Sequence, residues 1–135
     1  MMNEKLPKII VTTAPSFVAE QSDPAIRKFV WSYDITINNE SQSIVQLLTR
    51  YWKLVDMTGK IEEIQGVGVV GLQPLLKPDQ PFTYRSFCQL ATPQGTMEGF
   101  YVVQDLVGNQ FEVAVPKFML TAPISLAEPD RSKLH

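Results

Sequence analysis

The chain has one cysteine and one histidine among its 135 residues, and these two shortages exclude several classes of protein. A single cysteine, Cys88, cannot form an intrachain disulfide, which is typical of a reducing compartment. A Ser-His-Asp triad needs an internal histidine, whereas the histidine of this chain is the terminal His135. Metal sites need clustered histidine, cysteine or carboxylate ligands, and no such spacing occurs. We therefore expect no enzymatic activity, no cofactor and no metal site.

The chain also lacks a large excess of charge of either sign. The 12 Lys and Arg residues nearly balance the 14 Asp and Glu residues, and no segment is strongly basic. Nucleic-acid binding needs a basic surface that neutralises phosphates, so we expect none. The longest apolar run, residues 67–72, is interrupted by glycine and is far too short to cross a membrane. The N-terminal residues lack the apolar core of a signal peptide, so we expect a cytoplasmic protein without membrane contact.

What the chain does contain is typical of a globular β domain. Hydrophobic residues make up 44% of the sequence, and ten prolines and seven glycines provide turn residues at short intervals. No stretch shows a sustained helical period, and strand-like segments separated by turn signals predict a β-sandwich of about seven to nine strands. We expect a single domain over residues 1–135, with its core at about 8–123 and flexible termini.

Two segments carry the strongest strand signals. Apolar and polar residues alternate over 29–38, which predicts a strand with one buried and one solvated face. Residues 45–57 are bulky on both sides, as in a strand covered on both faces. Strict alternation there assigns two faces, one with Leu48, Trp52 and Leu54, the other with Leu47, Tyr51 and Val55. Trp31 and Trp52 are expected in the core.

Prolines interrupt two other strand-like segments. Pro15 lies within the apolar segment 8–18 and predicts either an edge strand or a break. Pro116 separates the alternating segment 111–115 from 117–121 and predicts a break between them. Further strands are expected at 61–65, 82–90 and 96–105, the first of them after a hairpin turn at 58–60.

A glycine pattern follows the predicted hairpin. Gly66, Gly68 and Gly71 match G-x-G-x-x-G, which in dinucleotide-binding domains follows a strand and opens a helix. Pro74 and Pro78 lie just beyond, and no helical pattern follows, so a dinucleotide-binding domain is excluded. Two interpretations remain open. The glycines provide backbone geometry for turns or bulges, or their amide groups bind an anion such as pyrophosphate or a nucleotide.

Arg50 is a second candidate site residue, because its position in the alternation is unusual. It lies between Leu48 and Trp52 on the same predicted face, so a charge is aligned with large apolar side chains. Such an arginine either extends its charge to solvent or stacks on an aromatic ring, or it contacts a partner or an anion. Arginine and tryptophan are both favoured at the energetic centres of interfaces.

Several sequence blocks together resemble a known family. The blocks are QLLTRYW at 46–52, QGVGVVGLQP at 65–74, TPQGTMEGFY at 92–101 and PKFML at 116–120. In these blocks, and over roughly residues 8–123, the chain resembles the ApaG family. Several ordered blocks at family-like spacing are far more specific than the glycine pattern alone.

The resemblance implies an immunoglobulin-like or fibronectin type III-like β-sandwich without an established enzymatic activity. It also implies a genetic link to cobalt and magnesium resistance or efflux, and gene neighbourhood with a diadenosine tetraphosphatase. Related domains in eukaryotic F-box proteins look like partner-binding modules. The chain departs from many members at Phe100, where a small polar residue or histidine is expected, so a contact surface at this position would be more apolar.

These observations predict a non-enzymatic interaction module with a protein partner. Recognition would use sheet faces, loop ends or sheet edges, with Arg50 and Phe100 as candidate contacts. The alternative is a small-ligand sensor that binds pyrophosphate or a nucleotide at Gly66, Gly68 and Gly71. The sequence leaves open whether the protein forms a homodimer.

Overall fold

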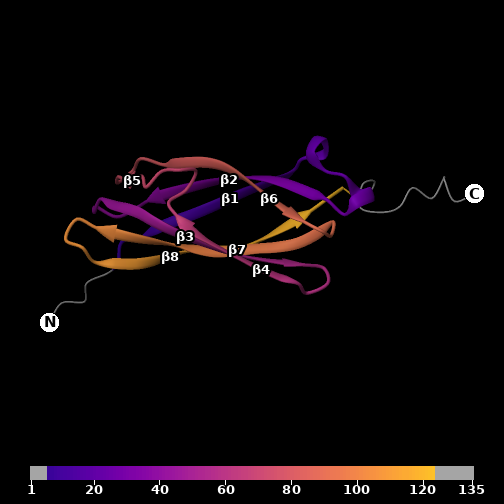
Figure 1. The fold of residues 1–135 in the computed structure, drawn as a ribbon. Helices are drawn as coiled ribbons and strands as arrows, with labels where there is room; N and C mark the ends of the chain where they lie inside the picture. The colour runs from indigo at the N-terminus through magenta and orange to yellow at the C-terminus, as the bar shows by residue number, and fades with distance from the viewer. Residues whose placement is uncertain (1–5, 124–135) are drawn as a thin grey trace, which may run out of the picture.

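The computed structural model describes residues 6–123, which form eight β-strands in two layers (Figure 1). The strands are β1 (Ile9–Phe17), β2 (Phe29–Asn39), β3 (Val45–Asp56), β4 (Ile61–Val67), β5 (Leu75–Leu76), β6 (Phe82–Leu90), β7 (Gln94–Asp105) and β8 (Gln110–Thr121). Two short 3-10 turns, η1 (Ala19–Gln21) and η2 (Pro24–Ile26), lie between β1 and β2. This arrangement confirms the predicted all-β sandwich. His135 and the two terminal segments lie outside the described residues.

The strands form two antiparallel sheets. One is three-stranded with the order β1-β2-β6; the other has the order β4-β3-β7-β8, with β5 paired to the start of β3. On one side of the sandwich β1 packs beside β8. On the other side β6 and β4 are the outermost strands of their sheets. No helix within residues 6–123 is long and apolar enough to span a membrane.

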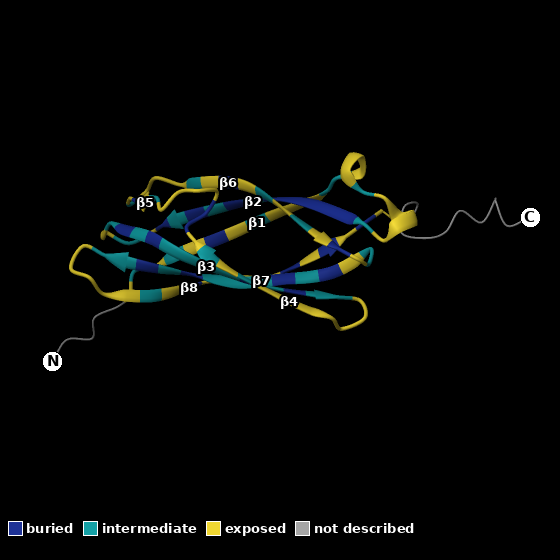
Figure 2. Cartoon of the chain, viewed as in Figure 1, coloured by how far each residue is buried: buried dark blue, intermediate teal, exposed yellow. Residues whose placement is uncertain are grey.

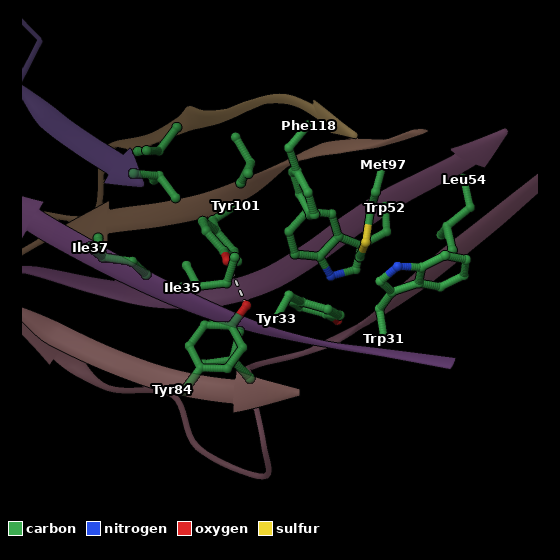
Figure 3. Packing of buried hydrophobic residues seen from close by; sticks show 14 of the residues in the cluster. Trp31, Tyr33, Ile35, Ile37, Trp52, Leu54, Tyr84, Met97, Tyr101 and Phe118 are labelled. Atoms are coloured by element: carbon green, nitrogen blue, oxygen red, sulfur yellow. Dashed lines mark hydrogen bonds between the residues drawn. The ribbon is translucent and has the colours of Figure 1, made fainter. Parts of the chain in front are cut away.

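The core lies between the two sheets. In Figure 2, β2 is coloured as buried over most of its length. Trp31 is 1% exposed and Trp52 is 2% exposed, which confirms both as core residues. Figure 3 shows the aromatic centre of this core, where the Trp52 ring meets three other rings edge-on or nearly so. Those rings belong to Tyr33, Tyr101 and Phe118.

A buried hydrogen bond between two tyrosine hydroxyls is one of those that join the layers. The hydroxyl groups of Tyr84 in β6 and Tyr101 in β7 are bonded to each other, as the dashed line in Figure 3 marks. Burial raises the pKa of both hydroxyls, so both stay protonated over the whole physiological range. Each hydroxyl satisfies the other in a place where an unpaired polar group would be costly.

The observed strands correct two predictions. A bulge shifts the β3–β7 register between Leu47 and Thr49, so Leu47 and Trp52 are both buried, although strict alternation placed them on opposite faces. The predicted break at Pro116 is wrong. β8 runs through this position, and Pro116 falls at a register shift against β7, where the missing amide hydrogen does not interrupt a regular ladder. β1 likewise runs through Pro15 and is an edge strand, which confirms the edge-strand alternative and not the break.

Candidate functional site

Residues 66–72, which contain the glycine pattern and are called the glycine segment, end in a tight turn. The backbone of Val69 exchanges two hydrogen bonds with that of Leu72, each 2.8 Å long, so only two residues form the loop between them. Both loop residues have left-handed backbones, with φ of 43° at Val70 and 79° at Gly71. Positive φ at both positions is the signature of a type I′ turn. Gly71 therefore provides the backbone geometry that this turn requires.

Val70 is the unexpected member of the turn. A β-branched residue rarely adopts positive φ, because its Cβ crowds the backbone there. The side chain is 53% exposed, so it contributes little to the core in return. The glycine pattern did not predict the positive φ of Val70, because a valine gives no sequence signal for that conformation.

Arg50 binds the start of the glycine segment. Its Nη1 atom donates hydrogen bonds to the carbonyl oxygens of Val67 at 3.1 Å and Gly68 at 2.8 Å. Gly66 stands directly opposite Arg50 in the β3–β4 register, and an ideal Cβ there would lie 2.7 Å from the Arg50 Cζ atom. The guanidinium thus lies across a backbone that carries no side chain. The amide of Gly68 donates in turn to the carbonyl of Leu48 at 2.8 Å, which fastens the segment to β3.

This geometry bears on the predicted anion site. The amides of Gly68 and Val69 already donate to backbone carbonyls, and part of the Arg50 guanidinium is bonded to carbonyl oxygens of the same segment. An anion would have to compete with these bonds. The geometry accounts for Gly68 and Gly71 through their positive φ and for Gly66 through the close approach of Arg50. Anion binding at Gly66, Gly68 and Gly71 remains a prediction.

The outer face of the β4-β3-β7-β8 sheet carries a different feature. Tyr51 of β3 stands directly opposite Phe100 of β7, and their rings stack with centroids 4.9 Å apart. In the next row Thr49 stands between Val67 and Val102. We call these five residues the aromatic patch. The Val67 side chain is 70% exposed, and the other four are half-buried, so this part of the face presents apolar surface to solvent.

A shallow hollow of about 430 Å³ lies over the aromatic patch. Its lining consists of Thr49, Arg50, Tyr51, Gln65, Gly66, Val67, Phe100 and Val102. The structure therefore brings three of the predicted site residues, Arg50, Gly66 and Phe100, to one place. It does not bring Gly68 or Gly71 there: Gly68 is buried, and Gly71 lies in the exposed turn.

Carboxylates surround the aromatic patch. The Tyr51 hydroxyl donates to the Glu63 carboxylate at 3.1 Å, and partial desolvation together with this carboxylate raises the pKa of Tyr51. Glu63 and Glu98 stand on either side of Lys53 in the adjoining row, and Glu112 stands opposite Val102. The patch thus combines aromatic and aliphatic surface with three nearby carboxylates, which outnumber the Lys53 ammonium group that stands between two of them.

The cysteine thiol and the carboxylates were the other candidate reactive groups of the sequence. Burial raises the pKa of the Cys88 thiol to about 12, so it is protonated at neutral pH and is a poor nucleophile. Within the part of the chain that the structure describes, no three His, Cys, Asp or Glu side chains are grouped to hold a metal ion. Glu62 and Glu63 occupy successive positions of β4 and so point to opposite faces of the sheet.

Fold and site together define a small immunoglobulin-like and fibronectin type III-like β-sandwich with a half-exposed aromatic pair on one outer face. The sequence profile of the ApaG domain matches residues 19–105. The chain is 42% identical to Protein ApaG of Rhodospirillum centenum over 130 residues, covering 96% of this chain and 100% of that protein. It is 46% identical to Protein ApaG of Beijerinckia indica over 117 residues, covering 87% and 90%. The chain belongs to the ApaG family.

A solved structure agrees with this assignment. The crystal structure of an ApaA protein from Bordetella pertussis superimposes with a TM-score of 0.84 at 39% sequence identity, covering 89% of this chain and 98% of that one. A second X-ray structure, from a structural genomics consortium, gives a TM-score of 0.81 at 34% identity. The names of these relatives state no enzymatic activity.

Proposed function

We propose that the protein is a non-enzymatic, cytoplasmic recognition module that binds a protein partner through the aromatic patch. The observation that carries this proposal is the stacked Tyr51–Phe100 pair, half-buried on the outer face of a sheet. Aromatic residues are enriched at the centres of protein interfaces, where they provide large and rigid contact area. Phe100 is then a direct contact. Arg50 supports the surface from behind by fixing the end of β4.

The chemistry of the patch favours a particular kind of partner. The face of an aromatic ring attracts both apolar side chains and the guanidinium or ammonium group of a basic residue. The carboxylates of Glu63, Glu98 and Glu112 stand in the neighbouring positions of the same face. A partner segment with an Arg or Lys next to an apolar residue therefore matches the patch. Any link to cobalt or magnesium resistance, which the family resemblance implies, would be exerted through that partner.

The test uses random peptides displayed on phage and selected on the immobilised protein. We expect selected peptides to share a basic residue beside an aliphatic or aromatic one. Phe100→Asp introduces a charge into the patch and should weaken their binding by about tenfold or more. The control is Ile26→Asp, at a residue that is 68% exposed in η2 and lies outside the patch. Circular dichroism spectra of both variants establish that they are folded.

The site of binding is read from amide NMR spectra during peptide titration. Shifts should concentrate on β3 and β7 around Tyr51, Phe100 and Val102. A selection that yields no binding peptide, or peptides that bind Phe100→Asp as tightly as the unmodified protein, would contradict the proposal. A parallel titration with pyrophosphate and ATP tests the alternative. Saturable shifts confined to Gly66, Gly68 and Gly71 would favour a ligand sensor instead.

A further inference from the structure

Besides the two-residue β5, four strands within residues 6–123 lie at sheet edges, and three of these four carry features that oppose pairing with another strand. β1 contains Pro15 and packs beside β8. β8 contains Pro116 at a register shift. β4 is short and carries the adjacent charges of Glu62 and Glu63. Proline, bulges and charged residues are the usual protection of sheet edges.

β6 is less protected, because it contains no proline and no bulge and its charged residue, Arg85, is paired within the sheet. Its nine residues pair with β2 in one uninterrupted register and include no proline or lysine. The charged residue of the strand, Arg85, is already bound to Asp34 through two hydrogen bonds of 2.7 and 3.1 Å. Within residues 6–123, β6 pairs with β2 alone, so its other edge offers free backbone groups. A long, regular edge of this kind is a template for strand addition.

Apolar surface accompanies this free edge. Phe87 of β6 stands opposite Ser32 of β2 on the outer face of its sheet and is 52% exposed. Ser86 and Cys88 point to the inner face but are only half-buried, because β6 is the last strand on this side of the sandwich. Another strand along β6 would cover all three.

We infer that β6 pairs with β6 of a second copy of this chain, antiparallel, around a two-fold axis at Ser86. Ser86 is the midpoint of the strand, so this register pairs all nine residues. The pairs are Ser86 with Ser86, Arg85 with Phe87, Tyr84 with Cys88, Thr83 with Gln89 and Phe82 with Leu90 of the other copy. Two three-stranded sheets then form one continuous sheet across the dimer.

The strand complements itself in this register, and this is what favours a second copy as its occupant. On the inner face, apolar or small side chains meet one another. On the outer face, Phe87 of each copy stands opposite Arg85 of the other. The guanidinium stays paired with Asp34, so the ring packs against the aliphatic part of that arginine side chain. An axis at Arg85 instead would place two guanidinium groups in opposition, which is unfavourable. An isologous contact with one self-complementary patch is also the commonest form of homodimer.

Sedimentation equilibrium tests the inference on the full chain. We expect a species of twice the 15.2 kDa chain mass. Phe87→Lys places an ammonium group beside Arg85 of the other copy and should weaken the dimer by about tenfold or more. Ile61→Lys is the matched control, because it adds the same charge at a 53% exposed residue of the other open edge, β4. A monomeric unmodified protein, or equal weakening by both variants, would overturn the inference.

Disulfide crosslinking tests the register without depending on dimer strength. In a Cys88→Ala background, Ser86→Cys brings two thiols together across the axis, so mild oxidation should give a covalent dimer. Thr83→Cys in the same background is the control, since Thr83 faces Gln89 of the other copy and its own counterpart lies far along the strand. Equal crosslinking of the two variants would contradict the register.

The dimer and the proposed recognition function can fail separately. The aromatic patch belongs to β3, β4 and β7, whereas the dimer contact belongs to β6 of the other sheet. A monomeric protein that binds the selected peptides overturns the dimer alone. A dimer that selects no peptide overturns the recognition function alone.

Discussion

The outer faces of the two sheets differ in how their side chains are paired. On the β1-β2-β6 face, Asp34 and Arg85 form an ion pair, and the hydroxyls of Thr36 and Thr83 share a hydrogen bond of 3.2 Å. On the β4-β3-β7-β8 face, the central feature is the Tyr51–Phe100 ring stack. The first face pairs these polar groups within the sheet, and its exposed ring, Phe87, lies on the edge strand β6 that we assign to the dimer. The second face carries a stacked ring pair over its central strands that nothing in residues 6–123 fully covers, and this is the surface to which we assign recognition.

The inner faces show no such contrast. Trp31 of the first sheet and Trp52 of the second are almost fully buried, and both sheets contribute aromatic side chains to one core. Burial of apolar surface is the dominant favourable contribution to folding. The stacked rings of Tyr51 and Phe100 lie outside this core.

The largest expected effect is a difference in stability between variants of Trp52 and Tyr51, which are neighbours on β3 and point to opposite faces of the sheet. Trp52→Ala removes a ring that is 2% exposed and should lower the free energy of unfolding by about 3–5 kcal/mol. Tyr51→Ala removes a half-buried ring and should cost only about 1 kcal/mol. Urea unfolding followed by far-UV circular dichroism measures both. Equal costs would show that Tyr51 serves stability, and the contrast between the faces would lose its functional meaning.

The next effect concerns the hydrogen bond between the hydroxyls of Tyr84 and Tyr101. Tyr84→Phe or Tyr101→Phe removes one hydroxyl and leaves the other buried without its partner, at a cost of about 1–3 kcal/mol. The double variant removes both groups and should be destabilised by clearly less than the sum of the single variants. Urea unfolding of all four proteins completes the cycle. Simple additivity would mean that water or another group takes the place of the missing partner.

The smallest effect concerns the ion pair of Asp34 and Arg85 on the outer face of the β1-β2-β6 sheet. The Arg85 hydrogen bond holds the pKa of the Asp34 carboxyl below its ordinary value. A lowered pKa means that the pair stabilises the fold above the ordinary carboxyl pKa, and that this contribution is lost as the pH falls through the lowered value. Arg85→Ala should return the Asp34 midpoint towards its ordinary value in a carboxyl-carbon NMR titration. Because both side chains are exposed, little change in stability should accompany it.

The sequence predicted the strands best where alternation is uninterrupted. The predicted segments 29–38 and 82–90 agree with β2 and β6 to within one residue, because period-two burial is a local property. The β3 bulge after Leu47 is not local. It depends on how β3 pairs with β7, and it reverses the face of every residue on one side of it.

The candidate site likewise depends on strand pairing that is not local in sequence. The stack of Tyr51 on Phe100 joins residues far apart in sequence, so only the register between β3 and β7 reveals it. The contact of Arg50 with Gly66 depends on register as well. Counting outward from the predicted turn at 58–60 pairs position 50 with position 68, whereas the observed hairpin pairs Val55 with Ile61 and therefore Arg50 with Gly66.

The contact between Arg50 and Gly66 also has a consequence for inheritance. The guanidinium occupies the place of a side chain that Gly66 does not have. A side chain gained at position 66 displaces the guanidinium from its carbonyl partners, and a shorter residue at position 50 leaves a vacant space over the glycine. The residues at positions 50 and 66 therefore depend on each other, and descendants of this gene are expected to keep both residues or to replace them together.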